Sequence, residues 1–338
     1  MTMMRRLLGQ TSLQVTPLGL GLAALGRPGY ITLGHAADLP GDAEASHSVA
    51  AMQAHCHAML DLAWTVGIRY FDAARSYGRA EEFLGNWLAG RSFSQNDLPV
   101  VGSKWGYIYT AGWRVQAPQH EVKEHTLPVL RRQWQESKAH LNDFLNLYQI
   151  HSATLESGVL TRPDVLAELA AIKAGGTCIG LSLSGENQGE VLAAALEVSV
   201  DGVQLFDSVQ ATWNLLEPSC APMLEAAHQA GLGVIIKEAL ANGRLTLRNQ
   251  EPTFTPKLAR LNAVAERHGT TVDAVALAAV LAKPWADVTL SGAAAPEHLQ
   301  ANLAALAIRL TPNDWDELSL LAETPQDYWA ARSRLRWN

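Results

Sequence analysis

The chain has 338 residues, of which 48% are hydrophobic and 17% are charged, so it can bury a large core and is not intrinsically disordered. Its formal net charge is −7 and it has no basic cluster, which argues against a nucleic-acid-binding protein. No apolar run reaches the roughly 20 residues that span a bilayer, the first residues lack a secretory-signal pattern, and three scattered cysteines fit a reducing compartment, so we expect a cytoplasmic protein that contacts no membrane.

Short β-branched or aromatic runs alternate along the chain with longer segments of helical periodicity. The runs are residues 15–20, 68–72, 98–104, 144–151, 177–183, 203–207, 233–237 and 287–291. Most are almost continuously apolar, which is typical of parallel strands buried on both faces. The alternation predicts an α/β fold, a single (β/α)8 barrel domain over residues 1–338. A doubly wound sheet is the alternative, but Gly19, Gly21 and Gly26 do not have its Gly-x-Gly-x-x-Gly spacing.

The segments between the runs begin and end with residues that are typical of helix termini. Thr161 and Pro163 begin one helix and Gly175 ends it. Further helices are expected near residues 126–141, 190–198, 222–230, 257–268 and 296–306, with an additional one at 272–282. Residues 26–45 form a long loop, which is either functional or a disordered insertion, and residues 324–338 form a C-terminal tail.

Ionisable residues end three consecutive predicted strands. Asp72 ends the second run, Lys104 the third and His151 the fourth. Charges at the ends of apolar strands are costly unless they are paired or used, and barrel enzymes build their sites at the carboxyl ends of the strands. We therefore expect these side chains to share a site with Tyr77, which follows Asp72 in the sequence FDAARSYG.

This set of residues suits proton transfer to a carbonyl oxygen. A phenol with a pKa near 10 is a poor acid at neutral pH, but a neighbouring ammonium group lowers that pKa. We expect Lys104 to act on Tyr77 in this way, Asp72 to hold the lysine, and His151 to align the substrate oxygen. No metal is required. The His-Cys-His run at 55–57 does not predict one either, because consecutive helical side chains point about 100° apart.

The sequence resembles the aldo-keto reductase superfamily over roughly residues 5–310. The matching segments are RRLLGQTSLQVTPLGLG, GIRYFDAARSYG, GSKWG, LYQIHSA, IGLSLSG and SGAAAPEHLQANLAAL. The resemblance implies a barrel with an N-terminal hairpin and an oxidoreductase that transfers hydride between a nicotinamide cofactor and a small-molecule carbonyl or alcohol (an aldehyde, ketone or sugar). It also implies that Tyr77 is the acid in reduction and the base in oxidation, within a tetrad completed by Asp72, Lys104 and His151.

The resemblance also implies cofactor contacts. Ser182 and Gln204 match the residues that hold the carboxamide, and Lys237 and Leu240 belong to a segment where the family commonly has an aromatic residue that stacks on the nicotinamide. The adenosine end matches Ser291, Gly292, Ala293, His298 and Asn302. Many relatives bind the 2′-phosphate with serine or arginine where this chain has alanine, which weakens NADP discrimination. The family favours NADP, so we expect NADP, with NAD as the alternative.

Candidate walls of the substrate pocket are aromatic, namely Tyr30, Trp105, Trp113 and Trp213, although core packing explains any one tryptophan equally well. The tail, TPQDYWAARSRLRWN, either folds over the pocket, frays or contacts another subunit. Arg75 is expected to pair with Glu81 or Glu82 rather than to bind an anionic substrate.

Two other functions use the same residues. A Schiff-base aldolase would employ Lys104 or Lys237 as its nucleophile. A regulatory or sensing module would bind the cofactor with little turnover, as some family members do.

Overall fold

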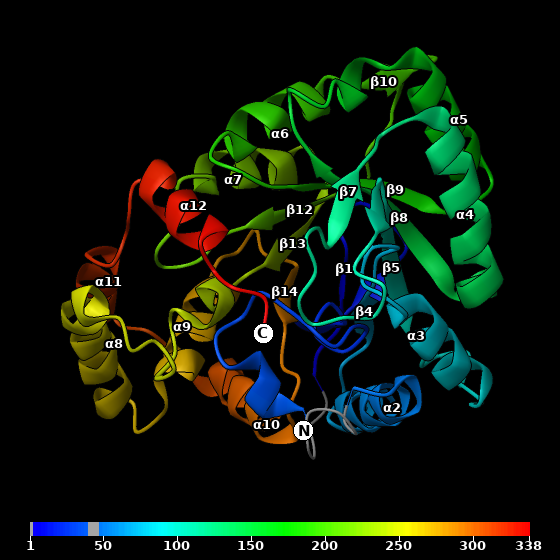
Figure 1. Ribbon diagram of the computed structural model, residues 1–338. Coiled ribbons are helices and arrows are strands. Elements are labelled where there is room, and N and C mark those ends of the chain that lie inside the picture. Colours follow the sequence, from blue (N-terminus) through cyan, green and yellow to red (C-terminus); the bar gives the residue numbers. More distant parts are fainter. Residues whose placement is uncertain (1–2, 40–46) are drawn as a thin grey trace.

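Eight parallel strands close into a barrel in the computed structural model, which describes residues 3–39 and 47–338 (Figure 1). The strands are β3 (Leu18–Gly21), β4 (Tyr70–Asp72), β5 (Val100–Trp105), β8 (Leu145–Ala153), β9 (Cys178–Leu183), β12 (Ser208–Thr212), β13 (Gly233–Lys237) and β14 (Val288–Ser291). The closure is the pairing of β14 with β3, where Leu290 lies opposite Gly19. The predicted (β/α)8 barrel is confirmed.

Helices surround the barrel, most of them with one face buried against it, whereas α8 (Thr255–Arg267) and α11 (Pro312–Ser319) pack on other helices in a second core (Figure 1). The helices are α2 (Val49–Thr65), α3 (Ala80–Ala89), α4 (Leu127–Leu141), α5 (Pro163–Ala174), α6 (Gln188–Leu196), α7 (Ala221–Gln229), α8 (Thr255–Arg267), α9 (Val272–Leu281), α10 (Pro296–Ala304), α11 (Pro312–Ser319) and α12 (Pro325–Ser333). The main core lies between strands and helices, where Phe71 of β4 and Ile150 of β8 are wholly buried with Leu224 of α7. Burying each such side chain contributes about 1.5–3 kcal/mol, so the core holds the strand ends rigidly.

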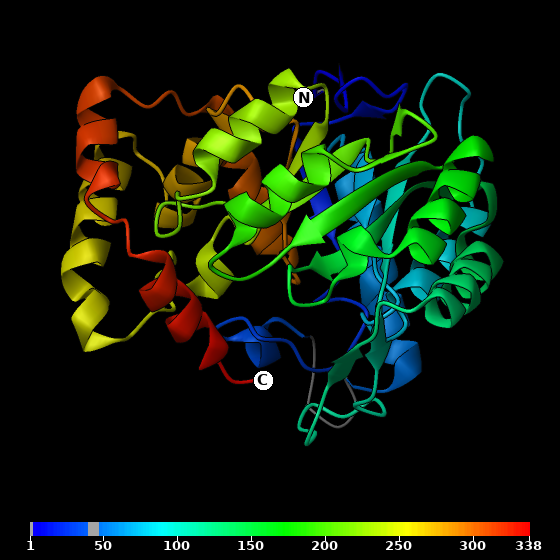
Figure 2. The same cartoon turned by 90° about the horizontal axis from the view of Figure 1, so that it is seen from above.

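The two ends of the barrel are covered by different segments (Figure 2). A hairpin of β1 (Arg6–Leu7) and β2 (Gln14–Val15) closes the end where the strands begin. Its Leu8 is wholly buried and packs so closely on β13 that a side chain at Gly233 would collide with it. The short helix η1 (His35–Asp38), the hairpin of β6 (Tyr107–Tyr109) and β7 (Glu121–Lys123), and the C-terminal tail gather at the opposite end.

The sixth strand lies further along the chain than the prediction placed it. Residues 203–204 belong to β11 (Val203–Gln204), which pairs with β10 (Ser199–Val200) in a small hairpin outside the barrel, and the barrel strand is β12. The apolar Leu205 and Phe206 are buried before the chain enters the barrel. In β12, Gln210 reaches into the barrel while Val209 and Ala211 pack outward in the main core, so its apolar signal is weak. Likewise, Val15 belongs to the hairpin and not to the first barrel strand.

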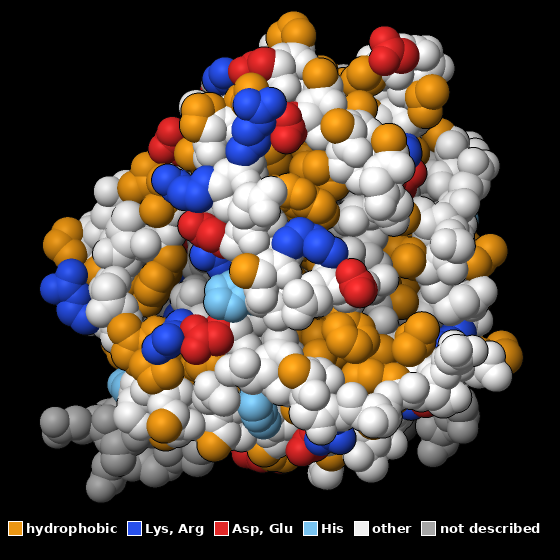
Figure 3. All heavy atoms as spheres, turned by 90° about the vertical axis from the view of Figure 1, so that its right-hand side faces the viewer, with side chains coloured by type: hydrophobic (Ala, Val, Ile, Leu, Met, Phe, Trp, Pro, Cys, Tyr) orange, Lys and Arg blue, Asp and Glu red, His pale blue; other side chains and the backbone are white. Residues whose placement is uncertain are grey.

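Within residues 3–39 and 47–338, no helix is both long and apolar enough to cross a membrane. On the face shown in Figure 3, lysine and arginine side chains are interspersed with acidic and apolar ones rather than gathered into a patch.

Candidate active site

A cavity of about 450 Å³ opens at the carboxyl ends of the strands. Asp72, Tyr77 and His151 line it, and Lys104 lies directly beneath with no exposed surface. The structure thus brings the four predicted tetrad residues together from β4, the turn after it, β5 and β8.

The tetrad is linked by a buried ion pair. The Lys104 ammonium donates to a carboxylate oxygen of Asp72 and to the Ala73 carbonyl at 2.9 Å. The same nitrogen lies 3.4 Å from the Tyr77 hydroxyl. Gln210 Nε2 donates to the second oxygen of Asp72 at 2.8 Å, so the buried carboxylate is hydrogen-bonded on both sides. The charged Lys104–Asp72 pair at the base of the cavity therefore places a hydrogen-bond donor, the Lys104 ammonium, beside the Tyr77 hydroxyl.

The position of Tyr77 is set by its own turn. The backbone N–H of Arg75 donates to the Lys104 carbonyl at 3.0 Å, and that of Tyr77 donates to Ala74 at 3.0 Å, which ties the turn to β5. The first loop packs on this turn so closely that a Cβ at Gly26 would lie 2.3 Å from the Tyr77 carbonyl oxygen. As expected, Arg75 pairs with Glu81, at 2.5 Å, and does not face the cavity.

The pKa of Tyr77 moves in the direction opposite to our expectation. Burial raises the pKa of this phenol well above its usual value, the charge of Asp72 raises it further, and Arg27 acts in the opposite sense. Lys104 does not reverse this shift, because its own charge is paired with Asp72 at close range. Tyr77 is therefore a protonated phenol at neutral pH, which is the form that donates a proton.

His151 is a neutral imidazole in the wall of the cavity. Burial lowers its pKa well below the usual value, and the charges of Lys104 and Lys237 add to this. Its ring meets that of Tyr77 edge to face, with centroids 5.5 Å apart. The register of β8 against β9 shifts after Ile150, and Ser152 has a positive φ of 52°, so a local bulge aims the histidine inward. A neutral ring can donate one hydrogen bond to a substrate oxygen.

Of the two predicted carboxamide contacts, neither lines the cavity. Gln204 is exposed in β11, where its backbone carbonyl accepts from Lys173, and Gln210 of β12 lines the cavity in its place. The error follows from the misplaced sixth strand. Ser182 is buried, and its hydroxyl accepts from the Ser152 N–H at 2.8 Å, while Ser184 reaches the cavity wall.

The end of β13 carries charge at the position where the family resemblance implies an aromatic residue. Lys237 lines the cavity, donates to Thr212 Oγ1 at 2.7 Å and lies 4.0 Å from Glu238. Burial lowers the pKa of Lys237 to about 8, while Glu238 opposes the shift. Burial would raise the pKa of Glu238, but Arg332 and Lys237 together hold it at about 2.

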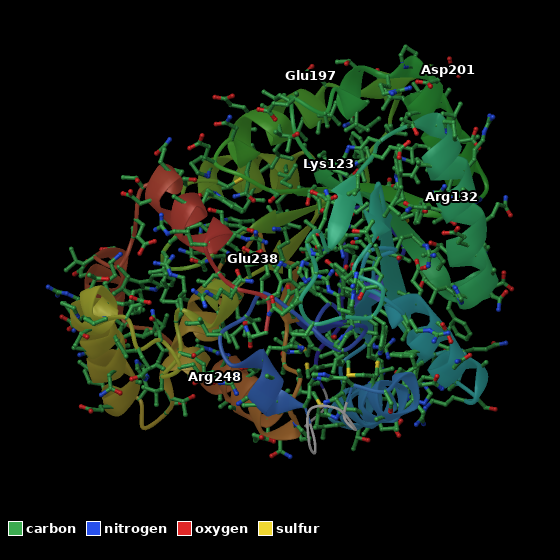
Figure 4. The ribbon with its side chains drawn as sticks, viewed as in Figure 1. Lys123, Arg132, Glu197, Asp201, Glu238 and Arg248 are labelled. Atoms are coloured by element: carbon green, nitrogen blue, oxygen red, sulfur yellow. The ribbon has the colours of Figure 1, made fainter. Side chains whose placement is uncertain are left out.

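The C-terminal tail folds over this part of the cavity. Arg332 of α12 binds Glu238 with hydrogen bonds of 2.6 and 2.9 Å, and Figure 4 shows Glu238 beside that helix. Asn338 pairs with the backbone of Tyr30 through two hydrogen bonds of 3.1 Å. Trp337 stacks on His120 at 3.8 Å and lines the cavity. Of the three alternatives for the tail, folding over the pocket is the one observed.

Leu240 lines the cavity, and the predicted adenosine contacts, from β14 and α10, line its other end. They are Ser291, Gly292, Ala293, His298 and Asn302. Asn302 Nδ2 donates to Ser291 Oγ at 2.8 Å, but its buried Oδ1 has no partner among the described residues. The first turn of α10 offers backbone N–H groups at the same end. An orphaned amide oxygen and a helix N-terminus fit a nucleotide.

The aromatic walls differ from the prediction. Tyr30 lines the cavity, but Trp105, Trp113 and Trp213 do not. Trp105 and Trp213 are buried in the core, and the Trp113 indole donates to the His47 carbonyl. Their places are taken by two aromatic residues that the sequence did not single out, Tyr107 of β6 and Trp337 of the tail. A hairpin and a tail that cross the barrel mouth give no sequence signal of where they fold.

Among residues 3–39 and 47–338, no group of three or more His, Cys, Asp or Glu side chains could hold a metal ion. The two histidines of the 55–57 run instead hydrogen-bond to separate carbonyls, His55 to Ala294 and His57 to Phe83.

Comparison with known proteins agrees with this geometry. The profile of the aldo/keto reductase family matches residues 31–323, so the chain belongs to this family. The structure of the aldo-keto reductase AKR11C1 from Bacillus halodurans, solved in its holo form, superposes on this chain with a TM-score of 0.72 at 20% sequence identity. The superposition covers 95% of this chain and 97% of the Bacillus halodurans chain.

Curated relatives are named as dehydrogenases or reductases. Pyridoxal 4-dehydrogenase of Microbacterium luteolum is 25% identical over 96% of this chain and 95% of its own length. An aryl-alcohol dehydrogenase of Pestalotiopsis microspora is 24% identical over 77% of this chain and 70% of its own length.

Proposed function

We propose that this protein is an NAD(P)-dependent oxidoreductase that interconverts a small aldehyde or ketone and the corresponding alcohol, with Tyr77 as the general acid and base. The convergence of Tyr77, His151 and the Lys104–Asp72 pair on one cavity carries the proposal. The family and the names of its dehydrogenase and reductase relatives support it.

Each residue of the tetrad has a separate task in this scheme. Tyr77 gives its proton to the carbonyl oxygen, and Lys104, 3.4 Å from the hydroxyl, stabilises the phenolate that remains. Asp72 keeps Lys104 charged and in place although burial lowers the pKa of the ammonium. Neutral His151 donates a hydrogen bond that aligns the carbonyl oxygen with the phenol. In the oxidative direction, the phenolate removes the alcohol proton.

The residues that would hold the cofactor follow one wall of the cavity. Gln210 and Lys237 lie near the tetrad, and Ser291, His298 and Asn302 lie at the far end. The nicotinamide would supply or accept the hydride when bound. The orphaned Asn302 oxygen and the N-terminus of α10 support this direction of binding.

The cavity wall favours an aromatic substrate. Tyr30, Tyr107 and Trp337 line it, and the Arg27 guanidinium lies 4.6–5.4 Å from the ring centroids of Trp337, Tyr77 and Tyr30. Flat apolar faces with a polar edge suit a planar ring that carries an aldehyde or hydroxymethyl group. The names of a pyridoxal and an aryl-alcohol dehydrogenase among the relatives agree with this class.

The test is a spectrophotometric assay of NADH and NADPH oxidation with aromatic aldehydes, aliphatic aldehydes, ketones and sugars. We expect turnover on aromatic aldehydes, and a loss of about 10²–10⁴-fold in kcat for Tyr77→Phe with nucleotide binding retained. A Tyr109→Phe variant removes the same hydroxyl from a tyrosine of the β6–β7 hairpin that does not line the cavity, and it should remain active. Near-normal activity of Tyr77→Phe would reject the proposed acid.

Lys237 keeps a Schiff-base aldolase as a second candidate, because this cavity lysine has its pKa lowered to about 8 by burial. Borohydride trapping of an aldehyde on Lys237, without nucleotide oxidation, would favour it. Tight nucleotide binding without turnover on the whole panel would favour a sensing module instead.

A further inference from the structure

We infer that Asp38 makes this enzyme select NAD over NADP, by placing a carboxylate where the 2′-phosphate of NADP would have to bind. This inference rests on the proposed function, which sets the nicotinamide at the tetrad and the adenosine at the opposite end of the cavity. Asp38 belongs to η1 in the long first loop and lines that end together with Arg248 and His298.

Asp38 is held in place by contacts with Arg248 and His298, which come from two other elements that line the cavity. Arg248, in the loop after β13, binds it with both terminal nitrogens, one of them at 2.9 Å. Arg248 also donates to the carbonyls of Leu33 and Gly34 at 3.1 Å, which fastens the first loop. His298 of α10 lies 3.5 Å from the same carboxylate. Figure 4 shows Arg248 beside η1 and α10.

The carboxylate is therefore positioned by three separate elements. Its side chain is only 7% exposed, compared with 31% for Arg248 and 35% for His298. The Asp38 carboxylate does not rotate away from these partners readily. Such a rotation would leave a charge, its own or that of Arg248, without a partner.

The charges at this end do not suit a phosphate. Asp273, at the start of α9, adds a second carboxylate to the cavity lining. Among the described lining residues contributed by η1, the β13–α8 loop, α9, β14 and α10, Arg248 is the only lysine or arginine, and Asp38 already neutralises it. A 2′-phosphate would bring nearly two further negative charges to a region that is already net negative.

A ribose hydroxyl suits the same place. An ionised carboxylate is an acceptor that takes hydrogen bonds from hydroxyl groups, and acidic side chains serve this purpose in other dinucleotide sites. To bind NADP, Arg248 would have to release Asp38 and leave that carboxylate beside the phosphate. The geometry at Asp38 thus favours NAD even though an arginine is present.

The test is isothermal titration calorimetry of the full chain with NADH and with NADPH, which needs no substrate. We expect the wild-type protein to bind NADH at least about tenfold more tightly than NADPH. In Asp38→Asn, Arg248 loses its charged partner and becomes available to phosphate, so we expect the preference for NADH to fall by about tenfold or to reverse. Asp38→Ser, with a smaller side chain, should shift the preference in the same direction.

The control is Asp316→Asn, which removes one charge from an exposed position on α11 and should leave the preference unchanged. Wild-type binding of NADPH as tight as or tighter than NADH would overturn the inference while leaving the oxidoreductase intact. An unchanged preference in both Asp38 variants would also overturn it. If neither nucleotide binds the wild-type protein, the proposed function itself fails.

Discussion

The two ends of the cavity are built in different ways. At the tetrad end, Asp72, Lys104 and His151 project from neighbouring barrel strands and are at most 8% exposed. At the far end, Asp38 and Arg248 come from a short helix and a loop, and the Arg248 side chain is 31% exposed. The strands are fixed by the core on both faces, whereas the loops are held mainly by one ion pair and a few hydrogen bonds.

The two ends of the cavity therefore have different tasks, proton transfer at the tetrad end and selection of the nucleotide at the far end. Proton transfer needs atoms aligned within hydrogen-bond distance, and a barrel core supplies that precision. The choice of nucleotide needs only the right charge in the right region, which a loop can provide. Changes at the tetrad end should therefore lower turnover strongly, and changes elsewhere should alter binding by smaller factors.

The largest effect is expected for Lys104→Met. Loss of the ammonium removes the stabilisation of the Tyr77 phenolate and leaves Asp72 with only neutral donors, so kcat should fall by about 10²–10⁴-fold and unfolding free energy by about 3–5 kcal/mol. Steady-state kinetics and denaturant unfolding measure the two losses.

A double variant separates these two roles of Lys104. Lys104→Met combined with Asp72→Asn removes the uncompensated charge and should recover most of the stability without recovering turnover. Recovery of turnover in the double variant would show that Lys104 acts on structure alone.

A matched pair of glutamines gives an intermediate effect. Gln210→Leu removes a cavity amide and the 2.8 Å hydrogen bond to Asp72, and we expect nucleotide affinity to fall by about tenfold. Gln204→Leu changes an exposed residue of β11 and should alter affinity by less than about twofold. Equal losses in the two variants would contradict the register of β12.

The smallest effect is a pH dependence that originates at Lys237. Its pKa is lowered to about 8, so the side chain is charged below that pH and neutral above it. Affinity for the anionic dinucleotide should weaken a few-fold as the pH rises from about 7 to 9. Thr212, Glu238 and Arg332 face this amine, and Glu238, with a pKa of about 2, stays ionised throughout this range.

Two replacements of Lys237 test the origin of this dependence in calorimetric titrations. Lys237→Met has no charge to lose and Lys237→Arg keeps its charge, so both should give a flat profile between about pH 7 and 9. A dependence that persists in both variants would assign it to another group.

The sequence by itself determined the barrel and the tetrad. Alternating apolar runs and helical segments predict the (β/α)8 fold, and Asp72, Lys104 and His151 are found by the rule that charge at the end of an apolar strand needs a use. Both signals are local, because each strand carries its own hydrophobic pattern and its own terminal residue.

Only the tertiary structure decided what crosses the mouth of the barrel. It placed Gln210 rather than Gln204 in the cavity. The sequence did not predict this, because the side chains that β12 directs into the barrel are small or polar and the strand therefore lacks a clear apolar pattern. It also brought Trp337 from the tail and Asp38 from the first loop to the cavity wall. Contacts between segments hundreds of residues apart depend on packing and charge pairing. These contacts produce no periodic pattern of apolar residues from which the sequence could predict them.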